Sequence, residues 1–409
     1  MSKEYKDLVV GLDIGTSKTT CMVAEVRPDG QFNVIGLGTQ PSNGLRRGVV
    51  VNIEATVDAI SRVIQEVELM ADCKIGDLYT GIAGSHIKSF NSNGMVAIKD
   101  KEVSTMDVER VIEVARAMPI PADQQILHIL TQEFIIDGQD GVREPIGMSG
   151  VKLEVKVHIV TGAVSAAQNV VKCVRRCGLE VMDLILQPLA SSYATLSDDE
   201  KGLGVCLVDI GGGTTDLAVF TQGAIRHTAV IPVAGDQITN DIAMALRTPT
   251  AEAEEIKIRH GVAMSSLADP SEMIEVPGVG DRSARKLSRQ ALADVIEPRV
   301  SELFELVQSE LRRSGYEELL SSGIVLTGGA SVMDGMIELG EEIFHMPVRI
   351  GAPQYKGGLA DVVCQPRYAT AMGLMVEAMA QRRRGIQARE TRNLRQMFDR
   401  MKGWFERNF

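Results

Sequence analysis

The feature that most constrains the fold is a short polar motif that occurs twice, each time after an apolar run. Residues 8–12 lead into Asp-Ile-Gly-Thr-Ser-Lys at 13–18, and residues 205–208 lead into Asp-Ile-Gly-Gly-Gly-Thr-Thr-Asp at 209–216. A second apolar run follows each motif, so each copy predicts a β-hairpin with a polar turn. A chain that carries the same hairpin twice is expected to contain two related lobes.

Hairpin turns rich in Gly, Ser and Thr are suited to hold phosphate, because Gly permits close approach and hydroxyls add donors. A single turn of this kind is common in ordinary hairpins, but two copies favour the phosphate interpretation. Asp13 and Asp209 supply the one or two carboxylates that Mg²⁺ accepts, and Lys18 adds a positive charge. The predicted phosphate ligands are Asp13, Gly15, Thr16, Ser17, Lys18, Asp209, Gly211, Gly212, Gly213, Thr214 and Thr215.

A third Gly-rich segment follows the predicted strand 324–326. Gly328, Gly329 and Ala330 are small enough for a flat base and a ribose to lie against the backbone. The alternative is a plain strand-to-helix turn.

The order of these motifs resembles the actin, sugar-kinase and heat-shock chaperone superfamily, over nearly the whole chain. Within it the chain resembles the FtsA family of bacterial actin-like cell-division proteins, whose members share an inserted subdomain and an amphipathic tail. The implied fold class is α/β: an actin-like (ribonuclease H-like) two-lobed fold with an inserted α+β subdomain and a C-terminal amphipathic helix.

The resemblance divides the chain into lobes and subdomains. The expected boundaries are 1–84 and 161–199 for the first lobe, 85–160 for the inserted subdomain, 200–235 and 306–384 for the second lobe, 236–305 for a helical subdomain of that lobe, 385–390 for a linker and 391–409 for the tail helix.

Further site residues are implied by the same resemblance. Gln187 opens the first connecting helix and would orient a water molecule, with Asp209 as the second catalytic residue. Glu254 and Lys257 would contact adenosine, although one turn apart they are equally a surface ion pair. The implied cofactors are ATP and Mg²⁺, and at most a weak ATPase activity is expected because no further strong base is evident.

The resemblance also implies a scaffold function at the cytoplasmic face of the inner membrane at the division site. Members of the FtsA family bind ATP, polymerise with themselves, anchor filaments of the tubulin-like protein FtsZ and help to recruit other division proteins. The subdomain 236–305 would receive the acidic C-terminal peptide of FtsZ, steered by Arg285, Lys286 and Arg289. The alternative for these cations is a solvated basic turn.

The C-terminal segment differs in charge from the rest of the chain. Residues 382–409 carry a net charge of +6 and the preceding residues one of −17, which disfavours a general nucleic-acid binder and favours an anionic membrane surface met by the tail. At helical spacing one face of the tail holds Leu394, Met397, Phe398, Met401, Trp404 and Phe405. Bulky apolar residues opposite excess positive charge are typical of an interfacial anchor, whereas the alternative is a helix docked on the core. Arg382, Arg383, Arg384 and the polar residues up to 390 are expected to form a solvated tether ahead of this helix.

Two other functions of the same fold stay open. A sugar or acyl kinase would need a base and a pocket for a second substrate, and the tail has no place in it. A pilus-assembly actin-like ATPase would share the fold and the insertion, but we would not expect the amphipathic anchor there.

Overall fold

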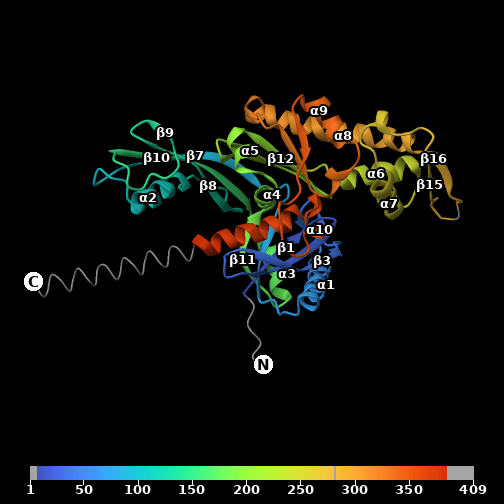
Figure 1. Cartoon of the computed structure of the whole chain (residues 1–409), viewed down its shortest axis with the longest axis horizontal. Coiled ribbons are helices and arrows are strands. Elements are labelled where there is room, and N and C mark those ends of the chain that lie inside the picture. Colours follow the sequence, from blue (N-terminus) through green and yellow to red (C-terminus); the bar gives the residue numbers. More distant parts are fainter. Residues whose placement is uncertain (1–6, 281, 385–409) are drawn as a thin grey trace, which may run out of the picture.

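The computed structural model describes residues 7–280 and 282–384, and it contains two lobes that are each built on a five-stranded sheet (Figure 1). In the first lobe the strand order is β11-β6-β1-β2-β3. The strands are β1 (Leu8–Ile14), β2 (Lys18–Val26), β3 (Phe32–Pro41), β6 (Asp77–Ile82) and β11 (Glu180–Leu186). β1 pairs with β2 antiparallel and with β6 parallel, so the first predicted hairpin is confirmed.

Helices cover both faces of the first sheet. On one face α1 (Ile53–Ala71) and α3 (Val164–Arg176) bury an apolar stripe that includes Ile60, Val63 and Val67. On the other face the helical residues 369–384 pack Ala371, Leu374 and other apolar side chains against the strands. A small ribbon of β4 (Leu45–Arg46) and β5 (Val49–Val50) precedes α1.

The second lobe repeats the plan of the first. Its sheet has the order β14-β13-β12-β17-β18, with β12 antiparallel to β13 and parallel to β17. The strands are β12 (Val205–Ile210), β13 (Thr215–Thr221), β14 (Ala224–Ile231), β17 (Ile324–Thr327) and β18 (Val348–Ile350). Each lobe therefore has an antiparallel hairpin beside a parallel strand, which confirms the two related lobes expected from the repeated motif.

Helices of four to 26 residues connect the lobes and cover the second sheet. They include α4 (Gln187–Thr195), α5 (Asp198–Leu203), α6 (Gly235–Leu246), α7 (Thr250–His260), α8 (Arg289–Ser314), α9 (Met336–Phe344) and α10 (Ala360–Val363). The 3-10 turns are η1 (Ser265–Leu267), η2 (Glu317–Leu319), η3 (Gly329–Val332) and η4 (Pro366–Tyr368). The largest apolar core joins α6, α8 and α9 to one face of this sheet.

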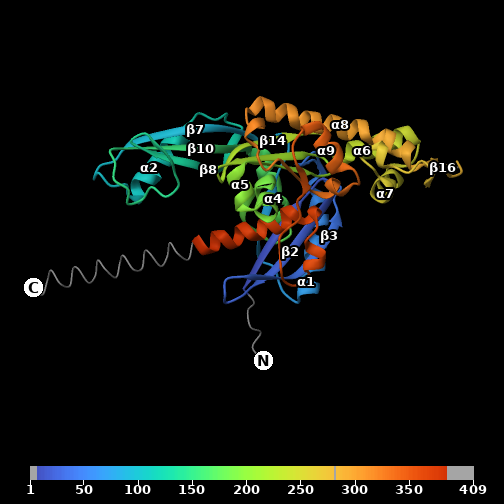
Figure 2. The ribbon, with the colours of Figure 1, turned by 45° about the horizontal axis from the view of Figure 1, so that its top comes forward.

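An α+β subdomain lies between β6 and α3 and projects to the left in Figures 1 and 2. Its sheet has the order β7-β10-β8-β9 and carries α2 on one face. The elements are β7 (Lys88–Ala97), α2 (Thr105–Arg116), β8 (Gln124–Ile136), β9 (Gln139–Val142) and β10 (Lys152–Ala163). Ser104 and Asp107 form a capping box at the start of α2, which is why the helix begins there.

The region predicted as a helical subdomain, 236–305, also contains a β-ribbon. β15 (Met273–Val276) pairs antiparallel with β16 (Arg285–Ser288), at the right of Figure 1. The region therefore combines helices with a short β-ribbon, whose strands are four residues long and enclose a turn-rich segment. The alternation of buried Ile274 and Val276 with exposed neighbours is the signal for β15.

The end of the second lobe corrects another expectation. Arg382, Arg383 and Arg384 were expected to form a solvated tether with the residues up to 390. They are helical instead, and their guanidinium groups bind the side chain of Asp7, the carbonyl of Gly30 and the side chain of Glu377. The predicted linker 385–390 and tail helix 391–409 lie outside the described residues, and among the described helices none is long and apolar enough to cross a membrane.

Candidate functional site

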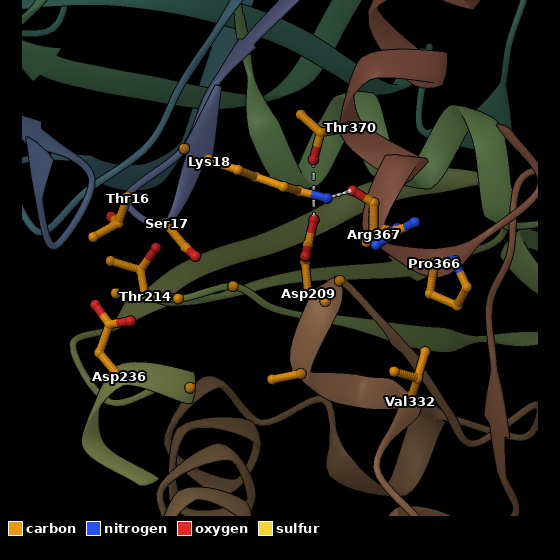
Figure 3. A pocket seen from close by; sticks show the side chains of 18 of the residues that line it. Thr16, Ser17, Lys18, Asp209, Thr214, Asp236, Val332, Pro366, Arg367 and Thr370 are labelled. Carbon is orange, nitrogen blue, oxygen red and sulfur yellow. Dashed lines mark hydrogen bonds between the residues drawn. The ribbon is translucent and has the colours of Figure 1, made fainter. Parts of the chain in front are cut away.

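A cavity of about 710 Å³ lies between the lobes, and the two hairpin turns face each other across it (Figure 3). The predicted site residues that line it are Asp13, Gly15, Thr16, Ser17, Lys18, Gln187, Asp209, Gly211, Gly212, Gly213, Thr214, Glu254, Lys257, Gly328, Gly329 and Ala330. Segments far apart in the sequence thus meet at one cavity.

The two turns have the same internal geometry. The amide of Gly15 donates 3.0 Å to the carbonyl of Lys18, and the amide of Gly211 donates 3.0 Å to the carbonyl of Thr214. The turns also approach closely: a Cβ added to Gly212 would lie 2.8 Å from the Cβ of Ser17. Glycine is therefore required where the second turn packs against the first, and the cavity beside this contact is lined by glycine-rich backbone that can hold a ligand.

Thr215 is the one predicted phosphate ligand that does not line the cavity. Its side chain is buried, and its hydroxyl donates 2.8 Å to the carbonyl of Val233. Successive side chains of a strand point to opposite faces, so Thr214 and Asp216 point toward the cavity while Thr215 points away.

Three buried carboxylates gather at the base of the cavity. Gln187 Nε2 donates 2.9 Å to Asp13, and Asp209 accepts from Ser191 at 2.6 Å and from Thr370 at 3.4 Å. Burial raises the pKa of Asp13 to about 7, against the opposing effect of Lys18, and burial also raises the pKa of Asp209. Carboxyl groups that lose this much hydration are stabilised as anions when a cation joins them.

Asp216 is the third carboxylate, and the sequence analysis did not assign it a role. Burial, with a smaller effect of Asp209, raises its pKa to about 8. Its Oδ2 accepts from Thr214 at 2.9 Å, whereas its Oδ1 is buried with no hydrogen-bond partner in the described part of the chain. Its place two residues after Thr214, at the start of β13, was the available signal.

These carboxylates fit a hard cation that retains most of its water. Residues 7–280 and 282–384 contain no cluster of three or more side chains arranged to hold a metal ion directly. Mg²⁺ is usually bound by one or two carboxylates together with water and substrate phosphates, so a sparse set of acids facing a phosphate site suits it.

Lys18 lies beside residues that the sequence analysis missed. Its Nζ donates 2.8 Å to the carbonyl of Arg367 (Figure 3). The same Nζ lies 4.6 Å from the ring centroid of Tyr368. Burial lowers the pKa of Lys18 to about 8, against the opposing effect of Asp13. The guanidinium of Arg367 lies 4.9 Å from the same ring, so two cations stand at this wall of the cavity.

The opposite wall suits a flat, partly apolar group. Lys257 is buried and donates to Gly235, Thr239 and Glu254 at 3.1, 2.8 and 2.7 Å. The ion pair of Glu254 and Lys257 therefore exists, and it also lines the cavity. Ile258 and Val332 line the same cavity with exposed apolar side chains.

Comparison with known proteins decides the family. A family model for cell division protein FtsA matches residues 206–373, and a model for the SHS2 domain inserted in FtsA matches residues 84–161. Cell division protein FtsA of Pseudomonas aeruginosa is 60% identical over 409 residues, which cover 98% of each chain. The chain belongs to the FtsA family.

Other FtsA proteins agree with this assignment. Those of Neisseria meningitidis serogroup B and Escherichia coli K12 are 53% and 45% identical, over 97% and 99% of this chain and 98% and 99% of theirs. The chain is thus a bacterial cell-division actin homologue, and the pilus-assembly and kinase alternatives are not favoured. Membership of the FtsA family implies nucleotide binding, partners among the division proteins and self-association.

Solved structures of low sequence identity confirm the fold. A chain of the PilM-PilN type IV pilus biogenesis complex has a TM-score of 0.66 at 19% identity, covering 91% of this chain and 98% of its own. MreB 5 of Spiroplasma citri bound to AMPPNP has a TM-score of 0.55 at 16% identity, covering 93% and 98%. The predicted actin-like fold of this FtsA-family chain is therefore confirmed.

The residues predicted to steer a partner peptide are not equivalent in the structure. Arg289 binds Glu272, Asp334 and the carbonyl of His260, and only 19% of its side chain is exposed. Arg285 lies on β16 and donates 2.5 Å to the carbonyl of Leu246. Lys286 is exposed on the same strand, so it is the one of the three best placed for an incoming acidic peptide.

Proposed function

We propose that this FtsA-family chain binds Mg-ATP between its lobes and links FtsZ filaments to an anionic membrane surface. The observation that carries the nucleotide proposal is the pair of glycine turns facing each other across one cavity, with Asp13, Asp209 and Asp216 at its base. Backbone amides of both turns and Lys18 would hold the phosphates, and a bound Mg²⁺ would neutralise part of the phosphate charge.

The adenosine would lie at the other end of the cavity. The segment Gly328 to Ala330 offers backbone without bulky side chains, and Ile258 and Val332 offer apolar surface to a base. Glu254 is 40% exposed beside Lys257, so its carboxylate can accept from ribose hydroxyls.

Hydrolysis is proposed to be slow. Gln187 lines the cavity and can orient a water molecule, but its amide is not a base, and the carboxylate beside it, that of Asp13, is proposed to hold the metal. ATP would therefore serve mainly to set the conformation of a scaffold.

The membrane and FtsZ parts of the proposal come from the sequence. The tail from Leu394 to Phe405 is proposed to lie in the membrane surface, and the 236–305 subdomain is proposed to receive the FtsZ C-terminal peptide through its exposed basic residues, Lys286 first. These parts place the protein at the cytoplasmic face of the inner membrane at the division site.

One factorial experiment tests the proposal. The full chain is mixed with Mg-ATP or buffer, with anionic or neutral vesicles, and with or without FtsZ polymer, and bound nucleotide and pelleted protein are measured. We expect ATP retention that is lost with EDTA, pelleting with anionic vesicles alone, and recruitment of FtsZ to vesicles only through the chain. Absence of ATP retention in every arm would refute the nucleotide proposal, and absence of FtsZ recruitment the scaffold proposal.

A further inference from the structure

The inserted subdomain is connected to the first lobe at both of its ends, but it packs against the second lobe. We propose that docking of this subdomain on β14 is energetically linked to occupancy of the nucleotide cavity, so that each changes the other. This inference rests on the proposed ATP binding. It is carried by a polar contact surface, an apolar cluster and two contacts that connect them to the cavity.

The polar surface, called here the β14 seam, consists of side chains of the inserted subdomain that bind the backbone around β14. Ser89 donates 3.0 Å to the carbonyl of Thr228, Gln132 donates 2.9 Å to that of Ile225, and Asn91 donates 3.4 Å to that of Arg226. Arg143 donates 2.8 Å to the carbonyl of Gln222 in the turn before β14. β14 is the edge strand of its sheet, and these bonds satisfy carbonyls along it.

His158 lies at the centre of the β14 seam. Its Nδ1 is 2.8 Å from Asn91 Oδ1 and its Nε2 is 3.1 Å from the hydroxyl of Thr228. Asn91 Oδ1 can only accept, so Nδ1 donates to it and Nε2 accepts from Thr228. Burial lowers the pKa of His158 to about 4, so the ring is neutral and this arrangement is constant around neutral pH. The β14 seam is thus a specific contact rather than a loose polar surface.

An apolar cluster beside the β14 seam joins the inserted subdomain to α4, the helix that begins at the cavity with Gln187. Val160 of β10 belongs to the same buried cluster as Leu189 of α4 and Ile225 of β14. From the same helix, Gln187 binds Asp13 of the first lobe and Ser191 binds Asp209 of the second. α4 therefore contacts two of the three cavity carboxylates and the base of the inserted subdomain, so it can transmit a shift from one to the other.

A second connection starts at the turn 13–18, the first of the two turns proposed to bind phosphate. The amide of Gly48 donates 3.0 Å to the hydroxyl of Thr16, and a Cβ on Gly48 would lie 2.9 Å from the Cα of Gly84. Gly84 lies between β6 and β7, where the chain enters the inserted subdomain. The backbone at this entry therefore packs directly on the segment that binds the phosphate turn, and closely packed contacts transmit small shifts.

Linkage makes the proposal testable without knowing the direction of the movement. If nucleotide binding and docking at the β14 seam change each other, the two effects must be equal in free energy and have the same sign. If disrupting the β14 seam weakens ATP binding, then ATP must protect the seam from opening. If disrupting the seam tightens ATP binding, then ATP must favour the open seam. The residues of the β14 seam and those of the nucleotide cavity do not overlap, because no side chain of the seam lines the cavity.

The experiment compares two seam variants with a matched control, all in the full chain. The double variant Asn91→Ala with Gln132→Ala removes the central donors, and Arg143→Ala removes only an exposed contact and so guards against misfolding. Asn93→Ala is the control, because Asn93 is an exposed asparagine on the same strand as Asn91 and its side chain makes no hydrogen bond within residues 7–280 and 282–384. Mg-ATP affinity is measured for each, and amide exchange of peptides covering 88–97 and 224–231 is followed in the unaltered chain with and without Mg-ATP.

We expect the double variant to change ATP affinity about fivefold or more, a typical size for linked sites. Arg143→Ala should shift it in the same direction by less, and Asn93→Ala should leave it unchanged. ATP should change exchange in both peptides in the sense that the affinity change requires. Unchanged affinity in both seam variants, or an exchange change of the opposite sense, would overturn the inference. Failure of the unaltered chain to bind ATP would instead refute the proposed function.

Discussion

Gln187 Nε2 donates a hydrogen bond of 2.9 Å to Oδ1 of Asp13. This bond joins the start of α4 to the glycine turn at 13–18. A Cβ added to Gly81 would lie 2.8 Å from Gln187 Cγ, so β6 packs against this side chain. The amide is thereby fixed beside the proposed metal and phosphate positions rather than free to sample solvent.

Gln187→Ala is expected to slow hydrolysis more than it weakens binding. Removing the amide leaves an attacking water without orientation, and loss of positioning lowers a rate by about tenfold or more. Single-turnover ATP hydrolysis and equilibrium ATP binding, measured on the same preparation, separate the two effects. Equal losses in both would show that Gln187 binds ATP rather than positioning water.

Gly212→Asp is expected to abolish ATP retention. The new side chain would start 2.8 Å from Ser17 and 3.1 Å from Asp236 Oδ1, and its charge would face the phosphates. Gly202→Asp is the matched control, because a Cβ at Gly202 meets no heavy atom within 4 Å. Filter retention of labelled ATP should fall at least about a hundredfold for Gly212→Asp alone. Equal retention in the two variants would remove the second turn from the site.

Metal affinity is expected to rise with pH. The pKa of Asp13 is about 7 and that of Asp216 about 8, so Mg²⁺ must displace protons below these values, and each displaced proton changes affinity up to about tenfold per pH unit. Asp216→Asn should flatten the upper part of the curve, between pH 7 and 8.5. Calorimetric Mg²⁺ titrations across that range measure this, and a parallel curve for the variant would contradict it.

The same substitution has an effect on stability whose sign follows from the direction of the shift. The pKa of Asp216 is raised above its ordinary 3.8, so its contribution to stability is full below that value and is lost as pH rises through about 8. Asp216→Asn should therefore raise the melting temperature of the metal-free protein at pH 8.5 and change it less at pH 6.

The local part of the site could be predicted from the sequence, and the tertiary part could not. A glycine-rich turn can be recognised in the sequence because only Gly tolerates such close approach, and Gly212, which the sequence singled out, lines the cavity. Arg367 and Thr370 follow no local signature; they reach the cavity only because the helix at 369–384 packs across the first sheet. For Thr215 the sequence held information that the prediction did not use. The alternation of side chains along a strand, with Thr214 and Asp216 facing the cavity, was sufficient to place the Thr215 side chain away from the cavity.

Arg289 and Lys286 are expected to respond differently to charge reversal. Arg289→Glu would leave Glu272 and Asp334 facing a like charge and should lower the free energy of unfolding by roughly 1 to 3 kcal/mol. Lys286→Glu should leave stability within about 0.5 kcal/mol and weaken binding of an acidic FtsZ C-terminal peptide at low salt. Chemical denaturation and fluorescence anisotropy measure the two. Unchanged peptide affinity in Lys286→Glu would exclude this strand from the peptide site.

Membrane attachment is expected to depend on the tail beyond Arg384. A chain ending at Arg384 retains the contacts of Arg382 with Asp7 and Leu8, so it should fold and bind ATP but not pellet with anionic vesicles. Trp404→Glu should lose most vesicle binding, because a buried indole contributes a few kcal/mol at about 25 cal/mol per Å². High salt should weaken the intact chain only partly. Vesicle pelleting of the truncated chain would place the anchor elsewhere.

The contact of Arg382 with Asp7 brings the first described residue of the chain to the last described helix, two residues before that helix reaches Arg384. A label attached at Asp7 would therefore lie beside this helix and disturb the ion pair. The turn between β8 and β9 is a better place for a label, because a Cβ at Gly138 meets no heavy atom within 4 Å. The proximity of Asp7 to Arg382 also makes the described part of the chain suitable for circular permutation, with new ends opened at the turn between β8 and β9.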